Sequence, residues 1–159
     1  MGFFGIKMES PNENAKPVRL EKEYEFMHEG FILSSQRKLY LLLKENNATI
    51  EALRFDFKIY QFGYPNDEVG LPSKTPGVAL YAFSEVFNSN WIKRLKKNNR
   101  SHSSHSDDLY RDDKHYIIRF KEVTLEVIAP KFQIVQLTRK EIDDFLDREI
   151  GFLTVTPRS

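Results

Sequence analysis

The stretch Lys114-His-Tyr-Ile-Ile-Arg-Phe-Lys-Glu-Val-Thr-Leu-Glu-Val-Ile-Ala-Pro-Lys-Phe-Gln-Ile-Val-Gln-Leu137 decides the fold. Residues 115–120 and 123–129 are rich in β-branched and aromatic side chains and flank Lys121-Glu122, which predicts a hairpin with a two-residue turn. After Pro130, residues 131–137 predict a third strand that continues the hairpin as a meander. The pattern indicates a sheet and leaves the activity open.

Strands are also expected in the N-terminal half. Alternating apolar and acidic residues predict a strand over 19–26, followed by a short strand at Phe31–Leu33. Residues 38–45 predict a third strand, joined through Asn46-Asn47 to a fourth that ends at Gly63. An alternative for residues 38–45 is a helix capped by Ser34 or Ser35, because the leucine spacing also suits a helical face.

Two helices complete the expected domain. Asn88 or Ser89 can cap a short helix whose far end is basic and stops at Asn98-Asn99. Thr138 and Glu141 have the spacing of a capping box, which predicts a helix from about Arg139 to Ile150, with Gly151 past its end. Its expected inward residues are Ile142, Phe145, Leu146 and Ile150.

These elements predict an α+β fold, with an antiparallel, strongly curled sheet of about six or seven strands and two helices packed on or beside it. Residues 1–18 are expected to be a flexible N-terminal segment, since 9–17 are polar and contain two prolines. Residues 19–153 are expected to form a single domain, and 154–159 a tail. Residues 63–77 are rich in proline and glycine and predict a long surface connection.

Composition excludes several classes of function. The 159 residues contain no cysteine, which rules out disulfides, a thiol nucleophile and cysteine zinc sites, and fits a cytoplasmic location. Twenty-four basic and 23 acidic residues leave a charge of +1, so nucleic acid would have to bind locally rather than through a global field. No apolar run is long enough to cross a membrane, the first eight residues carry no targeting signal, and no cofactor motif is present.

The chain resembles a family of small uncharacterised bacterial proteins in Gly63-Tyr-Pro-Asn-Asp-Glu68, Glu85-Val-Phe-Asn-Ser-Asn-Trp-Ile92, His102, His105 and the hairpin Lys114 to Ala129. The family's hairpin usually reads Phe-His-Asp-Ser-Thr-Phe-Glu, and its first block is followed by His-Pro. This chain keeps only Phe120, Thr124 and Glu126 of the hairpin motif. It has Leu71-Pro72 where the family has His-Pro. The resemblance spans about Gly63 to Ala129 and implies a bacterial origin and one fold, but it transfers no chemistry.

The polar loop from Asn98 to Asp113 is the one place where several metal-ligating side chains crowd together in the sequence. His102, His105 and Asp108, with His115 nearby, would suit a hydrolytic metal site if their backbone were ordered. The competing interpretation is a solvated, serine-rich loop without the support that fixes a metal's geometry. His115 opens a strand and is expected to be half-buried and hydrogen-bonded to the backbone.

Other candidates are weaker. Asp67 and Glu68 could act as acid and base or bind a cation, although adjacent carboxylates in a turn are usually solvated. Glu126 could be an inward carboxylate with a raised pKa, or a wet residue on an edge strand. A basic helix end with two aromatic side chains could contact phosphates and bases, or merely be solvated; it comprises Trp91, Lys93, Arg94, Lys97, Arg100 and Tyr110.

The sequence therefore favours a non-enzymatic binding protein whose partner is another protein. By analogy with other small cysteine-free domains, we expect an immunity-type or inhibitor-type protein. One alternative is a metal-dependent hydrolase or nuclease that uses His102, His105 and His115. A second alternative is a carrier of a small apolar ligand, if the sheet encloses a cavity. The oligomeric state is left open.

Overall fold

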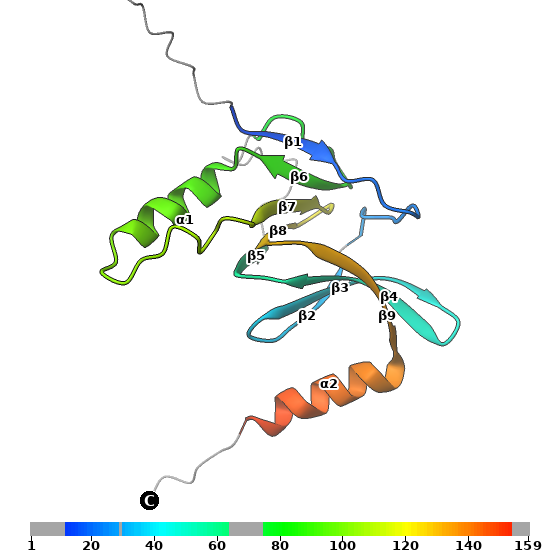
Figure 1. Ribbon diagram of the computed structural model, residues 1–159. Coiled ribbons are helices and arrows are strands. Elements are labelled where there is room, and N and C mark those ends of the chain that lie inside the picture. The colour runs from blue at the N-terminus through cyan, green and yellow to red at the C-terminus, as the bar shows by residue number, and fades with distance from the viewer. Residues whose placement is uncertain (1–11, 29, 64–74, 154–159) are drawn as a thin grey trace, which may run out of the picture.

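The fold is α+β, as the sequence predicts (Figure 1). The computed structural model describes residues 12–28, 30–63 and 75–153. Within these ranges there are nine strands and two helices. Their bounds are β1 Asn14–Pro17, β2 Phe31–Ser34, β3 Lys38–Asn46, β4 Thr49–Asp56, β5 Ile59–Gly63, β6 Phe83–Phe87, α1 Asn90–Arg100, β7 Lys114–Arg119, β8 Thr124–Ala129, β9 Phe132–Thr138 and α2 Arg139–Gly151.

The strands form two open antiparallel sheets rather than one. Sheet A has the order β1-β6-β7-β8-β5, and sheet B has the order β2-β3-β4-β9. The expected strong curl of a single sheet is not confirmed. The meander ends after β8, because β9 pairs with β4 of sheet B instead of continuing beside β8. Pro130, at the turn between β8 and β9, marks the point where the chain changes sheets.

Both predicted hairpins are confirmed. In the β7–β8 hairpin the amide of Phe120 donates to the carbonyl of Val123 at 2.9 Å, which closes the turn at Lys121-Glu122. The turn between β3 and β4 contains Asn47 with φ of 54°, a left-handed conformation that asparagine tolerates. Residues 38–46 are a strand, so the helical alternative for this segment is wrong.

The core lies between the two sheets. Leu39, Leu41, Leu53 and Phe55 of sheet B are fully buried against apolar residues of β7 and β8. Aromatic rings bridge the sheets, since the ring centroid of Phe55 lies 5.6 Å from that of Tyr116 and 6.2 Å from that of Phe83. Side chains of this size account for much of the burial free energy of a small domain.

The two helices lie on different sheets. Helix α1 lies beside β6 and β7, whereas α2 follows β9 and lies under sheet B (Figure 1). Ser89 is the N-cap of α1, and Thr138 with Glu141 forms the predicted capping box of α2. Two details of the predicted ends are wrong: α1 continues through Asn98-Asn99 to Arg100, and Gly151 is the last residue of α2 instead of lying past it.

The predicted inward face of α2 is only partly covered. Ile142 and Phe145 are half-buried, and the Phe145 ring packs edge-on against Tyr40 of β3. Leu146 and Ile150, which were also expected to point inward, are 40% and 61% exposed. The helix therefore rests on sheet B mainly through its first half, and its C-terminal half leaves apolar side chains in solvent.

Several N-terminal predictions are wrong because pairing there is non-local. Residues 14–17, expected to be flexible, form β1 and pair with β6. Residues 19–26, expected to be a strand, have no regular structure. They are held instead by Lys22 and Tyr24, which both donate to the buried Glu51 carboxylate of β4. The apolar side chains of this segment pack against the core, although its backbone belongs to neither sheet.

The expected fourth strand is two strands. β4 ends at Asp56, and β5 begins at Ile59 in the other sheet. The short link at Phe57 and Lys58 carries the chain from sheet B to sheet A, and the amide of Lys58 donates to the carbonyl of Ile128 at 2.9 Å. The predicted surface connection falls largely within residues 64–74, which lie outside the described residues, as do Leu71-Pro72 of the family resemblance.

Candidate functional site

The loop histidines do not come together with His115. His102 and His105 are exposed in consecutive turns between α1 and β7, whereas His115 is 3% exposed within β7. Asp108 is engaged in an ion pair with Arg111. In the described ranges no group of three or more histidine, aspartate or glutamate side chains is arranged to hold a metal ion. The metal site considered from the sequence is therefore not assembled there.

The basic residues predicted for binding are placed along α1 and are exposed: Lys93, Arg94, Lys97 and Arg100. Arg100 pairs with Asp107 at 3.4 Å. Tyr110 lies in the following loop, where the Lys58 ammonium is 5.2 Å from its ring centroid. The Trp91 ring lies edge-on to that of His115. The two aromatic side chains thus have separate partners. Asp67 and Glu68 lie outside the described residues.

A buried polar network runs across the outer face of sheet A, and we call it the His115 network: Ser89, His115, Glu126 and Gln61. The Ser89 hydroxyl lies 2.9 Å from Nδ1 of His115, and Nε2 of the same ring lies 3.2 Å from Oε1 of Glu126. The Gln61 amide donates to the other oxygen of Glu126. His115 is therefore fully buried and bonded to side chains, which corrects the expectation of a half-buried residue bonded to the backbone.

Strand register explains why these groups meet. Gln61 lies directly opposite Glu126 across the β5–β8 pair, and Ile117 lies opposite Glu126 across the β7–β8 pair. His115, two residues before Ile117, is the diagonal neighbour of Glu126 on the same face, a separation that long side chains bridge. Ser89 reaches His115 from the first turn of α1, just past the end of β6.

Hydrogen bonding keeps Glu126 ionised. Burial acts to raise the pKa of this carboxyl, but the hydrogen bond and charge of His115, the Gln61 amide and the charge of Arg119 outweigh burial, so the pKa lies below its ordinary value. The raised pKa considered from the sequence is therefore wrong. Glu126 lies on the outer face of sheet A but is nonetheless buried, since it is only 8% exposed.

The order serine, histidine, glutamate is also that of a nucleophile, a base and an orienting acid. The Ser89 hydroxyl, however, accepts a hydrogen bond from the Ile92 amide at 3.2 Å and is the N-cap of α1. Ser89 is 4% exposed, which leaves an acyl group little room to approach its oxygen. Both ring nitrogens of His115 are therefore engaged, Nδ1 with Ser89 and Nε2 with Glu126. The network orients Glu126 and ties α1 to sheet A.

A pocket of about 390 Å³ opens in front of this network, and we call it the Trp91 pocket; its lining includes Glu13, Gln61, Trp91, Arg94, His115 and Glu126. The Glu13 carboxylate accepts from the Asn90 amide, at the N-terminus of α1, and from the Thr75 hydroxyl at 2.9 Å. Sequence reasoning considered His115 and Glu126 separately but missed Glu13 and Gln61, because only the tertiary pairing of β1 and β5 brings them here.

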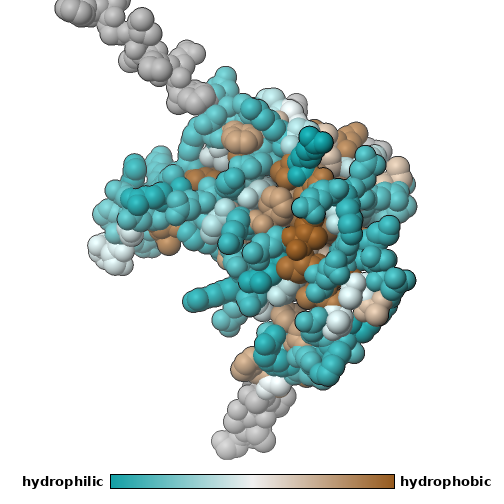
Figure 2. Space-filling model, turned by 45° about the vertical axis from the view of Figure 1, so that its right-hand side comes forward, coloured by the Kyte–Doolittle hydropathy of each residue, from teal (hydrophilic) through white to brown (hydrophobic). Residues whose placement is uncertain are grey.

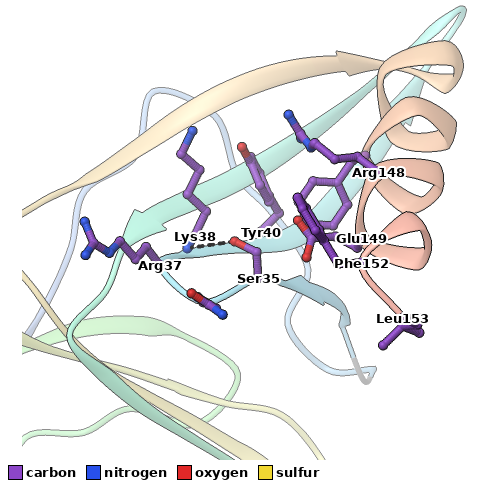
Figure 3. A pocket seen from close by; sticks show the side chains of 10 residues that line it. Ser35, Arg37, Lys38, Tyr40, Arg148, Glu149, Phe152 and Leu153 are labelled. Atoms are coloured by element: carbon purple, nitrogen blue, oxygen red, sulfur yellow. Dashed lines mark hydrogen bonds between the residues drawn. The ribbon is translucent and has the colours of Figure 1, made fainter. Parts of the chain in front are cut away.

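A second hollow lies between the β2–β3 turn and the end of α2, and we call it the C-terminal groove; its lining includes Arg37, Lys38, Tyr40, Phe145, Arg148 and Phe152. Its volume is about 620 Å³. Figure 3 shows Tyr40 of β3 facing Arg148 and Phe152, with Arg37 and Lys38 at the opposite end of the groove. Tyr40 thus lies between the cationic pair Arg37 and Lys38 at one end and Arg148, Glu149 and Phe152 at the other.

Apolar side chains at the end of α2 are well exposed, and two of them, Phe152 and Leu153, line the groove. Ile150, Phe152 and Leu153 are 61%, 73% and 77% exposed. Figure 2 shows apolar residues at the lower end of this face, beside the point where the chain leaves α2, as well as over the sheets. Neighbouring exposed side chains of this size often mark a surface that another molecule covers.

Comparison with known proteins gives no family, because no family model, no curated protein and no solved structure matches this chain. Neither helix of the described residues is long and apolar enough to span a membrane.

Proposed function

We propose that this protein works by binding another protein, and that the C-terminal groove is the binding surface. The observation that carries the proposal is the exposed apolar end of α2, where Phe152 and Leu153 line a groove that also contains the rings of Tyr40 and Phe145. A large apolar side chain that is buried on binding contributes roughly 1.5–3 kcal/mol, so a few such contacts are enough for a specific complex.

The charges around the groove define the partner's chemistry. Arg37, Lys38 and Arg148 line the groove and are exposed, and no ion pair joins them to another described residue. Glu149 is the one acidic residue in the lining. The surface suits a segment that inserts an apolar or aromatic side chain between flanking carboxylates, because unpaired rim cations favour negative charge on the partner.

An immunity-type or inhibitor-type protein in a bacterial cytoplasm remains the best analogy for a small cysteine-free domain of this kind, and it belongs to this proposal. The alternative of a metal-dependent hydrolase gains no support from the geometry, since His102 and His105 are exposed and His115 is engaged by Ser89 and Glu126. The alternative of an apolar carrier gains none either, because aromatic rings fill the space between the sheets.

Selection from a library of displayed random peptides tests the proposal. We expect the full-length protein to enrich peptides in which an aromatic or aliphatic residue is flanked by aspartate or glutamate. The Phe152→Glu variant places a carboxylate at the groove and should bind the enriched peptides at least about tenfold more weakly.

Leu109→Glu is the matched control, because Leu109 is an exposed apolar residue in the loop between α1 and β7, outside the groove. It should bind the selected peptides as the unmodified protein does. Peptides without a shared acidic and apolar pattern, or equal loss of binding in both variants, would show that the C-terminal groove is not the binding surface.

A further inference from the structure

The Trp91 pocket lies on sheet A, away from the C-terminal groove on sheet B, and the proposed function makes no use of it. Its volume of about 390 Å³ falls within the range of about 300–1,000 Å³ typical of small-molecule sites. Polar side chains from β5, α1, β7 and β8, and from the segments beside them, converge on the pocket. Such convergence of polar groups in one hollow is typical of a ligand-binding site.

The floor of the pocket is a fixed negative charge. Glu126 is held by His115 and Gln61, and its pKa is lowered, so the carboxylate is ionised near neutral pH. A carboxylate has about four acceptor positions, and these two partners occupy two of them. The remaining positions can accept hydrogen bonds from an ammonium group, and a cation here would also lie near the face or edge of Trp91.

The rim of the pocket carries an unpaired positive charge. Arg94 is exposed one turn after Asn90 on α1, and no ion pair joins it to another described residue. Glu13, the other acidic residue in the lining, already accepts from the Asn90 amide and from Thr75. The Arg94 guanidinium is therefore free to bind a carboxylate, the group that its planar donors match best.

We propose that the Trp91 pocket binds an amino-acid-sized zwitterion, with its ammonium group on Glu126 and its carboxylate on Arg94. The buried Glu126 and the exposed Arg94 carry opposite charges and line the same small hollow. A molecule with both charges satisfies both ends, whereas a simple amine or a simple acid satisfies one end only.

Trp91 is the only tryptophan of the chain, so its fluorescence reports on the pocket directly. We expect a saturable change on titration with at least one common amino acid, with a dissociation constant of roughly 1 mM or lower. The amine and the carboxylic acid that match its side chain, each lacking the other charged group, should bind at least about tenfold more weakly.

Arg94→Gln should weaken binding about tenfold without changing the fold, because Arg94 is exposed and forms no ion pair with a described residue. Lys97→Gln removes an exposed positive charge from the same helix outside the pocket lining and should leave binding unchanged. Glu126→Gln should abolish binding, provided that circular dichroism shows the native fold. Absence of a saturable response to any amino acid up to about 10 mM, or equal binding by the Arg94 and Lys97 variants, would overturn the proposal.

Discussion

Replacement of Ser89 by alanine tests whether the His115 network supports the fold. The Ser89 hydroxyl has two structural roles: it accepts from the Ile92 amide at the start of α1, and it bonds to Nδ1 of His115 at 2.9 Å. Ser89→Ala removes both bonds and leaves a buried imidazole nitrogen without a partner, since His115 is 3% exposed.

The expected change in the free energy of unfolding follows from the loss of these two hydrogen bonds. Loss of an N-cap costs about 1 kcal/mol, and a buried polar group left unpaired costs about 1–3 kcal/mol. We therefore expect Ser89→Ala to lower the free energy of unfolding by about 2–4 kcal/mol. Thr138→Ala is the matched comparison, because Thr138 caps α2 in an exposed position and bonds no buried group. Its expected cost is the cap alone, about 1 kcal/mol.

Urea unfolding, followed by Trp91 fluorescence and by far-UV circular dichroism, measures both variants under the same conditions. Coincident transitions by the two probes would support two-state behaviour and allow the free energies to be compared. If Ser89→Ala costs no more than Thr138→Ala, the bond to His115 contributes nothing to stability, and the reasoning is refuted.

Three further predictions concern single features. The lowered pKa of Glu126 stabilises the fold above the ordinary value of 4.5, and this stabilisation is lost as pH falls through the folded pKa; the difference in unfolding free energy between the unmodified protein and Glu126→Gln should therefore shrink in acid, and a pH-independent difference would contradict this. Gly77 has φ of 86°, and a Cβ there would press on the backbone of β1, so Gly77→Ala should lower the urea midpoint by an amount equivalent to about 2 kcal/mol, whereas Gly151→Ala, which meets open space, should not lower it. Joint replacement of His102 and His105 by alanine should change the unfolding free energy by less than about 0.5 kcal/mol, and a larger calorimetric or denaturant effect would show that the loop imidazoles contribute to the fold.

Local patterns were sufficient for the hairpins and helix caps. The Lys121-Glu122 turn, the Asn46-Asn47 turn and the Thr138–Glu141 capping box all lie within a few residues of the groups that they bond. Hydrophobic alternation also predicted the antiparallel strands and therefore the fold class. Interactions at short sequence separation can be inferred from residue type and spacing alone.

Partner choice between strands could not be predicted in this way. β9 alternates apolar and polar residues as a third meander strand would, but it pairs with β4, more than 70 residues earlier in the chain. The acidic alternation over residues 19–26 suggested a strand, whereas Lys22 and Tyr24 serve to satisfy the buried Glu51. In both cases tertiary contacts determine the structure, and the local sequence pattern does not show which contacts form.

In the candidate sites, too, the sequence indicates individual residues but not the tertiary contacts between them. His115 and Glu126 were recognised as isolated candidates, but their bond depends on strand register, and the contribution of Gln61 depends on β5 crossing into sheet A. The exposed end of α2 was predicted to be inward because a helical pattern shows which face is apolar, without showing whether a neighbour covers it.

Amide chemical-shift mapping gives the most direct test of the C-terminal groove. A peptide with an aromatic residue between two aspartates, taken from the displayed library, would be titrated into uniformly ¹⁵N-labelled full-length protein. We expect the largest shift changes to fall on residues 35–40 and 145–153, which contribute the lining of the groove. Changes confined to α1, β7 and β8, or spread evenly over both sheets, would contradict it.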